Sequence, residues 1–187
     1  MNDTSEYVIR GIRADEWRKV KELRLAALAD PVAPIAFLES PAEAAAQPDE
    51  FWQDRAERGA QGSAVRQFVA EAADGRWVGS VTVLLESAGV RGIFGEEIPV
   101  DQGHLVGVFV RPEQRGTGLT EALFQGGLDW AWAREEPALE RVRLFVHEDN
   151  ARAAAFYRRF GFEPSGTVVP MPGDSGAEEL EYLLARP

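Results

Sequence analysis

Apolar and polar positions along the first half of the chain predict strands and helices in alternation. Apolar runs of strand length lie at 65–72 and 77–85, and the Asp-Gly pair in the segment 73–75 between them favours a hairpin of antiparallel neighbours. Apolar residues recur at helical spacing over 14–29, after a short run at 7–13 that predicts a strand. The pattern therefore predicts a mixed α/β fold.

The segment 40–43, Ser-Pro-Ala-Glu, carries a helix-start signal. It places a serine, a first-turn proline and a glutamate where a capping box needs them. The segment 47–49, Gln-Pro-Asp, is expected to interrupt this helix, and a further helical segment then runs to the glycines near 59–62. Residues 86–102 contain three glycines and a proline and predict a long loop or an extended hairpin.

The second half continues the alternation of strand and helix. The predicted elements are a strand at 105–110, a turn at 111–117, a helix at 118–134, a strand at 142–146, a helix at 150–160 and closing strands at 162–169 and 179–184. Gly126 and Gly127 inside a helix cost about 1 kcal/mol each relative to alanine. They indicate a closely packed neighbour, and Trp130 and Trp132 are the nearest bulky residues in the sequence.

Length and composition limit the class of protein. The 187 residues, 45% of them hydrophobic, suffice for one core and are too few for two ordinary domains, so we expect a single domain over 1–187. The longest apolar stretches fall short of the roughly 20 residues that cross a bilayer. Residues 1–6 lack the basic start and apolar core of a secretory signal, so we expect a cytoplasmic protein that does not bind membranes. Without cysteine and with two histidines, we expect no metal.

Net charge bears on the class of partner. The 20 Lys and Arg residues against 31 Asp and Glu give a charge of −11. Such a charge repels a phosphate backbone and argues against nucleic-acid binding. A cationic or amine acceptor fits better, and any anionic cofactor must then be held by local geometry.

The segment Arg115-Gly116-Thr117-Gly118 lies between a predicted strand and a predicted helix. Unpaired N–H groups and the positive end of the helix dipole converge on an anion at such a place. Glycine lets the backbone approach phosphate oxygens and adopt turn conformations that other residues resist. The segment predicts a phosphate site, and a purely structural connection is the alternative.

A second motif follows one strand and one helix later. Residues 150–162 read Asn-Ala-Arg-Ala-Ala-Ala-Phe-Tyr-Arg-Arg-Phe-Gly-Phe. Together the two motifs resemble the acyl-CoA-binding motifs of the GCN5-related N-acetyltransferase (GNAT) superfamily, which read Gln/Arg-x-x-Gly-x-Gly/Ala and roughly Asn-x-x-Ala-x-x-Phe-Tyr-x-x-x-Gly-Phe. The order of elements agrees over nearly the whole chain, although the N-terminal third is matched by layout alone. The resemblance implies the GNAT fold, a central, mostly antiparallel twisted sheet flanked by helices.

The resemblance also implies acetyl-CoA as the cosubstrate. Backbone amides from Arg115 to Thr120 would hold the pyrophosphate, Val108 to Val110 would pair with the pantetheine arm like an added strand, and Asn150 would contact that arm. The expected cofactor-binding residues are Val108, Phe109, Val110, Arg115, Gly116, Thr117, Gly118, Leu119, Thr120 and Asn150. Thr120 departs from the family's Gly or Ala: its branched side chain crowds the helix start, while its hydroxyl offers a donor to phosphate.

The implied reaction is direct attack of an amine on the thioester, which needs a proton acceptor, donors for the developing oxyanion and an acid for the thiolate. Tyr157 occupies the family's acid position, and simple packing beside Phe156 and Phe160 is the alternative. A backbone N–H near Phe109 or Val110, freed by a bulge, is the expected oxyanion donor.

His104 is the expected base, because it stands where family members often have a glutamate and imidazole titrates near neutral pH. A merely structural histidine at a strand end is the alternative. Glu96 and Glu97 are further candidates from the preceding loop, and His147 is expected to be structural or a loop hydrogen-bonder.

The sequence thus predicts an N-acetyltransferase whose acceptor is an amine on a small molecule or a peptide. The alternatives are a non-catalytic CoA-binding sensor or interaction module and an enzyme that transfers an acyl group other than acetyl. Homodimerisation is compatible with the sequence. The N-terminal aromatic residues are candidates to line the acceptor pocket, or else to form core: Trp17, Phe37, Phe51 and Trp52.

Overall fold

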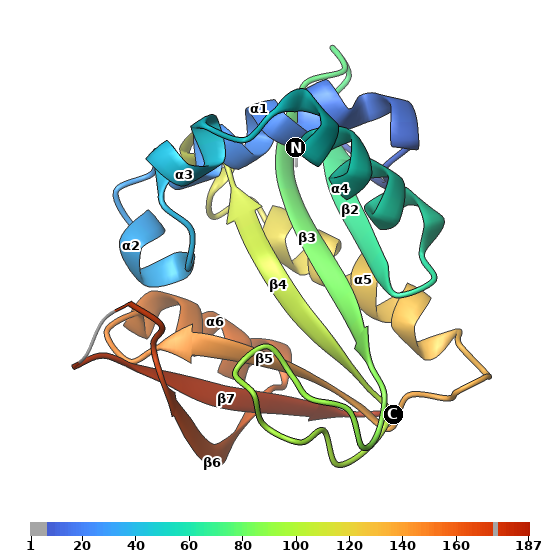
Figure 1. The fold of residues 1–187 in the computed structure, drawn as a ribbon, viewed down its shortest axis with the longest axis vertical. Coiled ribbons are helices and arrows are strands. Elements are labelled where there is room, and N and C mark those ends of the chain that lie inside the picture. Colours follow the sequence, from blue (N-terminus) through green and yellow to red (C-terminus); the bar gives the residue numbers. More distant parts are fainter. Residues whose placement is uncertain (1–6, 174–175) are drawn as a thin grey trace.

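The computed structural model describes residues 7–173 and 176–187 (Figure 1). The expectation about residues 1–6 therefore lies outside the described part. The strands are β1 (Val8–Gly11), β2 (Val65–Glu71), β3 (Trp77–Glu86), β4 (Gln102–Val110), β5 (Arg141–His147), β6 (Glu163–Pro170) and β7 (Glu178–Ala185). The helices are α1 (Trp17–Leu28), α2 (Ala33–Ala36), α3 (Pro41–Ala45), α4 (Asp49–Gln61), α5 (Leu119–Trp132) and α6 (Ala151–Phe160), with short 3₁₀ turns η1 (Ala14–Glu16) and η2 (Pro112–Gln114).

One seven-stranded sheet, in the order β1-β2-β3-β4-β5-β7-β6, runs through the molecule. Every neighbouring pair is antiparallel except β4 and β5, which run parallel. The prediction of a mixed α/β fold built on a mostly antiparallel sheet is therefore confirmed. Among the described helices, none is long and apolar enough to cross a membrane.

Local signals in the sequence act as expected at two places. Gly75 takes a φ of 82° in the turn between β2 and β3, which only glycine adopts readily, and the two strands pair antiparallel. Ser40 accepts a hydrogen bond from the Glu43 amide at 3.2 Å, while the Glu43 carboxylate accepts one from the Ser40 amide at 2.8 Å. Both halves of the capping box are therefore formed at the start of α3.

Two hydrophobic layers cover the two faces of the sheet. Helices α5 and α6 pack on one face, where Leu123 and Phe124 join the strand residues Val81 and Val83. Helices α1, α3 and α4 cover the other face of the N-terminal strands, and their core contains Trp52 with Val69 of β2. Figure 1 shows α1, α3 and α4 across one end of β2–β4, with α5 behind the strands.

Three details differ from the predictions. Strand β4 begins at Gln102 rather than Leu105, so His104 lies inside the strand and not at its start. The short helix α2 was not predicted. The close neighbours of the glycines in α5 are strand residues, not tryptophans: a Cβ on Gly126 would lie 2.8 Å from Ile9, and one on Gly127 3.2 Å from Val83. The glycines therefore let α5 approach the sheet.

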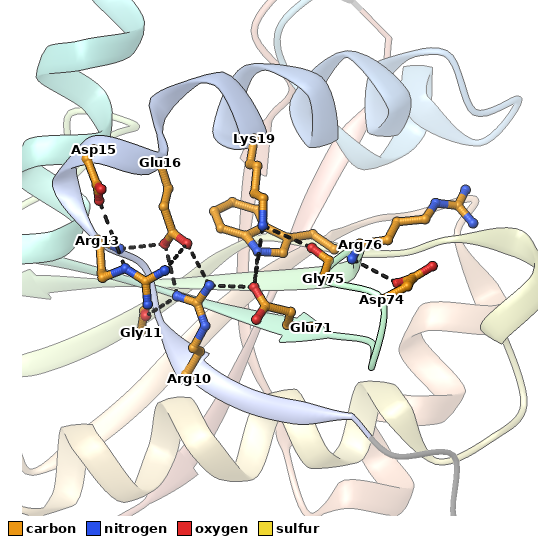
Figure 2. Close-up of polar contacts among 11 residues, drawn as sticks. Arg10, Gly11, Arg13, Asp15, Glu16, Lys19, Glu71, Asp74, Gly75 and Arg76 are labelled. Atoms are coloured by element: carbon orange, nitrogen blue, oxygen red, sulfur yellow. Dashed lines mark hydrogen bonds and ion pairs between the residues drawn. The ribbon is translucent and has the colours of Figure 1, made fainter.

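A polar cluster fastens the N-terminal strand and helix to β2 (Figure 2). The Arg10 guanidinium bridges the carboxylates of Glu16 at 2.6 Å and Glu71 at 2.5 Å. Glu71 also accepts a hydrogen bond from the Trp77 indole at 3.0 Å. Burial would raise the pKa of Glu16, but the hydrogen bonds and positive charges of Arg10 and Arg13 together outweigh burial and lower that pKa. The cluster orients α1, which forms part of the cavity wall described next.

Candidate active site

The site lies where β4 and β5 part. They pair only over Gln102–His104, opposite Arg141–Arg143, and diverge beyond these residues (Figure 1). A cavity of about 880 Å³ occupies this region, lined by β4 from His104 to Val110 and by β5 from Leu144 to His147. Because helices from both layers also line it, the cavity joins the two faces of the sheet.

A bulge distorts β4 at the centre of the cavity wall. The register with β3 shifts between the pairs Thr82–Val106 and Ser80–Phe109, and Gly107 takes a φ of 62°. Val108 therefore has no Cα partner on β3 among the described residues. On its other edge, β4 pairs with no described strand beyond His104. Backbone groups near the bulge are thus available to a ligand, and the bulge expected beside Phe109 is present.

The turn before α5 is shaped for an anion. Gly116 and Gly118 have φ values of 80° and 85°, and a Cβ on either would meet no described atom within 4 Å. Packing thus does not require glycine at these positions, but the backbone conformation does, and the open space leaves room for a ligand to approach the backbone. No described side chain caps the start of α5, so within the described structure its first N–H groups are left for an anion.

The neighbours of these glycines are held in place by protein contacts. The Arg115 side chain binds Asp30 at 2.5 Å and the Val110 carbonyl at 3.1 Å, so the backbone of Arg115, not its charge, is offered to a ligand. The Thr117 hydroxyl donates to the Gln114 carbonyl at 2.7 Å. Leu119 is buried in the core, while Thr120 lines the cavity in the first turn of α5. The uncapped, glycine-containing turn fits a pyrophosphate group.

Asn150 and Tyr157 face the cavity from the other side of the opening. Asn150 caps α6, its side-chain oxygen accepting from the Ala153 amide at 3.3 Å. Tyr157 is 9% exposed and stacks on Phe124 with ring centroids 5.8 Å apart. Tyr157 therefore belongs both to the aromatic core and to the cavity wall. A role in packing is thus compatible with a role as the acid.

The sequence did not single out Glu179, which lines the cavity from β7. It pairs in register with His147 at the end of β5, and burial raises the pKa of its carboxyl. Burial and then the charge of Glu179 raise the pKa of Tyr157 above its ordinary value, so the phenol stays protonated at neutral pH. His147 accepts a hydrogen bond from the Asp149 amide at 3.1 Å, in line with the structural role expected for it.

His104 is part of a buried hydrogen-bonded pair. Its ring is 1% exposed, and Nδ1 lies 3.0 Å from the Glu86 carboxylate. Burial would raise the pKa of Glu86, but hydrogen bonds from His104 and Arg143 outweigh burial and lower it to about 2. An ionised carboxylate can only accept, so the proton of neutral His104 resides on Nδ1 and Nε2 is left as a proton acceptor.

Arg143 holds Glu86 in place from β5. It donates twice to the Glu86 carboxylate, both at 2.8 Å, and also binds Glu96 at 2.5 Å and Glu181 at 3.2 Å. Glu96 is thus engaged with Arg143, and neither Glu96 nor Glu97 lines the cavity. Of these three candidate bases, His104 is therefore the one that lines the cavity.

The N-terminal aromatic residues divide between the two roles considered for them. Phe37 lines the cavity. Trp52 is fully buried, and Trp17 and Phe51 pack against the same core beneath α1 and α4. Of this aromatic set, Phe37 is thus a cavity residue and the other three belong to the core.

Comparison with known proteins agrees with this geometry. Residues 28–162 match the model of the acetyltransferase (GNAT) family. The chain is 40% identical over 102 residues to a mycothiol acetyltransferase of Saccharomonospora viridis, a match that covers 54% of this chain and only 31% of that relative. It is 26% identical over 184 residues to the L-amino acid N-acetyltransferase AaaT of Escherichia coli K12, covering 97% of this chain and 98% of the relative.

Solved structures share the fold. A GNAT-family acetyltransferase from Streptococcus pneumoniae superposes with a TM-score of 0.70 at 17% identity, covering 97% of this chain and all of the other. Spermidine N-acetyltransferase from Vibrio cholerae, solved with CoA and spermine, gives a TM-score of 0.67 at 18% identity, covering 97% and 96% of the two chains. With the family model matched over residues 28–162 and the same fold in these structures, the chain belongs to the acetyltransferase (GNAT) family.

Proposed function

We propose that the protein transfers the acetyl group of acetyl-CoA to an amine of a small molecule or peptide by direct attack. One observation carries the proposal: the uncapped start of α5, with its positive-φ residues Gly116 and Gly118, borders the same cavity as Tyr157 and His104. An anion site and two proton-transfer groups in one cavity suit an acyl donor with a pyrophosphate handle.

The residues that would hold acetyl-CoA form a continuous path. The backbone from Arg115 to Thr120 would bind the pyrophosphate, and the free edge of β4 from Val108 to Val110 would hydrogen-bond the pantetheine arm. The amide nitrogen of Asn150 would contact the same arm. When bound there, acetyl-CoA supplies an activated acetyl thioester, and a cytoplasmic location fits dependence on this donor.

The catalytic groups divide the proton transfers between them. His104 would take the proton of the attacking amine at Nε2, directly or through a water, since Glu86 fixes the proton of the neutral ring on Nδ1. A backbone N–H beside the bulge, near Phe109 or Val110, would stabilise the negative charge that develops on the carbonyl oxygen. Tyr157 would hold a proton on Oη and deliver it to the departing sulfur.

Relatives support this reaction class and leave the acceptor open. The relatives are named as a mycothiol acetyltransferase, a putative ribosomal protein alanine N-acetyltransferase and an L-amino acid N-acetyltransferase. The full-length match is to the amino-acid enzyme, whereas the match to the mycothiol enzyme covers about a third of its length. An amine is the group that these acceptors have in common.

Calorimetric titration with acetyl-CoA tests the cofactor site. Wild-type protein is expected to bind with micromolar affinity, and Gly118→Trp is expected to abolish binding because the new ring fills the space that the phosphate needs. Gly75→Trp is the matched control, since Gly75 has a similar φ of 82° and equally open surroundings but lies in a hairpin turn outside the cavity. Absence of binding to the wild type would overturn the proposal.

Turnover of an amine panel tests the chemistry. Tyr157→Phe is expected to lower kcat by about 10² to 10⁴ and to keep acetyl-CoA affinity, whereas Tyr182→Phe, a buried neighbour 6.3 Å away between ring centroids, is expected to have little effect. Tight acetyl-CoA binding with no thiol release for any amine would instead indicate a CoA-binding module without catalysis.

A further inference from the structure

The cavity wall formed by α1 and α4 carries an excess of positive charge. Arg24, Arg55 and Arg58 all line it. Arg24 is paired with Glu39 at 2.9 Å. Arg55, in contrast, forms no hydrogen bond or ion pair with any residue that the structure describes, and its recorded contact is with the ring of Trp52 at 5.8 Å. Arg58, Arg152 and Arg159 also line the cavity without an acidic partner among the described residues, but they are exposed, whereas Arg55 is half-buried.

The surroundings of Arg55 make its unpaired positive charge energetically unfavourable. Burial, followed by the positive charge of Arg24, lowers the pKa of Arg55 to about 10, and the nearby charge of Glu39 offsets only part of this. The side chain is still cationic near neutral pH. A desolvated charge without a partner is unfavourable, so an anion bound beside it would relieve that cost.

Arg55 is connected to the reaction centre by a row of polar residues. On α4 it lies one turn before Gly59, on the same helix face, and a Cβ on Gly59 would lie 3.4 Å from Gln67 of β2. Gln67 pairs in register with Thr82 of β3, and Thr82 pairs with Val106, the residue before the β4 bulge. Two strand spacings, about 10 Å, separate Gln67 from the bulge.

The polar groups in this row are also free. Gln67 and Thr82 line the cavity, and neither side chain makes a hydrogen bond to another described residue. A ligand that bridges Arg55 and the bulge would therefore find two neutral hydrogen-bonding groups along its way. Such a ligand must carry an anion at one end and the reacting amine at the other.

Resting on the acetyl transfer proposed above, we propose that Arg55 binds the carboxylate of the acceptor, which is therefore a molecule that carries both a carboxylate and an amine, with amino acids as the simplest such class. The planar guanidinium suits a carboxylate because it can donate two parallel hydrogen bonds. Gln67 and Thr82 hydrogen-bond the acceptor beside it and orient the amine toward the bulge in β4.

The positive charge on the cavity wall formed by α1 and α4 argues against the cationic acceptor that the net charge of the chain suggested. The whole-chain charge of −11 favours a cationic acceptor, but a polyamine here would face three arginines. The acidic side chains of the cavity lie elsewhere or are engaged: Asp30 binds Arg115, Glu179 lies beside Tyr157, and Glu121 belongs to the first turn of α5. A zwitterionic amino acid matches this distribution and a polyamine does not.

Acetylation assays with matched acceptors test the inference. The probes are the twenty L-amino acids, the carboxamides of those that react, and spermidine. Wild-type protein is expected to acetylate the amino acids at least about tenfold more efficiently than their carboxamides. Arg55→Gln is expected to raise KM for the amino acid about 10- to 100-fold, as expected for loss of a charged hydrogen-bonding partner, with the carboxamide KM and acetyl-CoA affinity unchanged. Arg18→Gln, an exposed arginine on α1 outside the cavity, is the matched control.

The outcomes separate this inference from the function on which it rests. Equal use of amino acids and carboxamides, preference for spermidine, or an Arg55→Gln variant with unchanged amino-acid KM would overturn the carboxylate site while leaving acetyl transfer intact. Failure to acetylate any amine would overturn the proposed function itself. Retained acetyl-CoA binding by Arg55→Gln shows that the variant is folded.

Discussion

Replacing Glu86 with glutamine removes the charge at the centre of the buried network and keeps the shape of the side chain. Glu86 accepts two hydrogen bonds from Arg143, one from Gln102 at 2.7 Å and, in neutral His104, one from Nδ1. The network lowers the pKa of Glu86 from 4.5 to about 2, and each pKa unit corresponds to about 1.4 kcal/mol. We therefore expect Glu86→Gln to lower the free energy of unfolding by about 3 kcal/mol at pH 7.

Urea denaturation at several pH values measures this effect. With a typical urea dependence of about 2 kcal/mol per molar, the midpoint at pH 7 is expected to fall by about 1.5 M. Because folding lowers the pKa of Glu86, its stabilisation is complete above pH 4.5 and is lost as the pH falls towards 2. Wild type and variant should therefore converge over that interval.

The control is Glu135→Gln, which changes an exposed glutamate with no ion pair among the described residues. It should leave the free energy of unfolding within about 0.5 kcal/mol of the wild-type value. Equal midpoints for wild type and Glu86→Gln at pH 7, or a difference between them that persists unchanged at low pH, would refute the assignment of this stabilisation to the ionised carboxylate.

Three further predictions concern the reaction and the N-terminal cluster. His104→Gln should lower kcat by about 10² to 10⁴ without weakening acetyl-CoA binding; steady-state kinetics with unchanged kcat would exclude His104 as the base. Because burial and the charge of Glu179 raise the pKa of Tyr157, kcat should not fall through ionisation of the phenol up to about pH 10. A pH–rate profile in which kcat falls near pH 9, both in the wild type and in Glu179→Gln, would contradict this. Arg10→Met leaves the buried carboxylate of Glu16 with fewer partners and should cost about 1 to 3 kcal/mol in chemical denaturation; an unchanged midpoint would show that the cluster contributes little.

Short-range signals account for the parts of the fold that the sequence predicted well. The Asp-Gly turn before β3, the capping box of α3 and the glycine turn before α5 each depend on a few adjacent residues whose backbone preferences are strong. The two cofactor motifs are local in the same sense. They predicted the cavity-lining residues Gly116, Gly118, Asn150 and Tyr157 without knowledge of how the strands pair.

The parts that the sequence did not predict depend on contacts between distant segments. Glu86, His104 and Arg143 meet only because β4 pairs with β5 over three residues and β3 ends beside them. Nothing near Arg143 in the sequence distinguishes it from a solvated strand arginine. Arg55 likewise became informative only when the structure revealed which of its charged neighbours were already paired, a property that composition and periodicity do not contain.

The separation of β4 and β5 bears on how the two sides of the cavity can change during evolution. The anion turn belongs to the layer of α5 and α6, and the arginine wall belongs to the layer of α1 and α4 on the opposite face of the sheet. Substitutions in one layer need not disturb packing in the other, because the sheet separates them. Substitutions at the arginines of α1 and α4 can therefore change that side of the cavity and leave the turn before α5 in place, provided that the contact between Asp30 and Arg115 is kept.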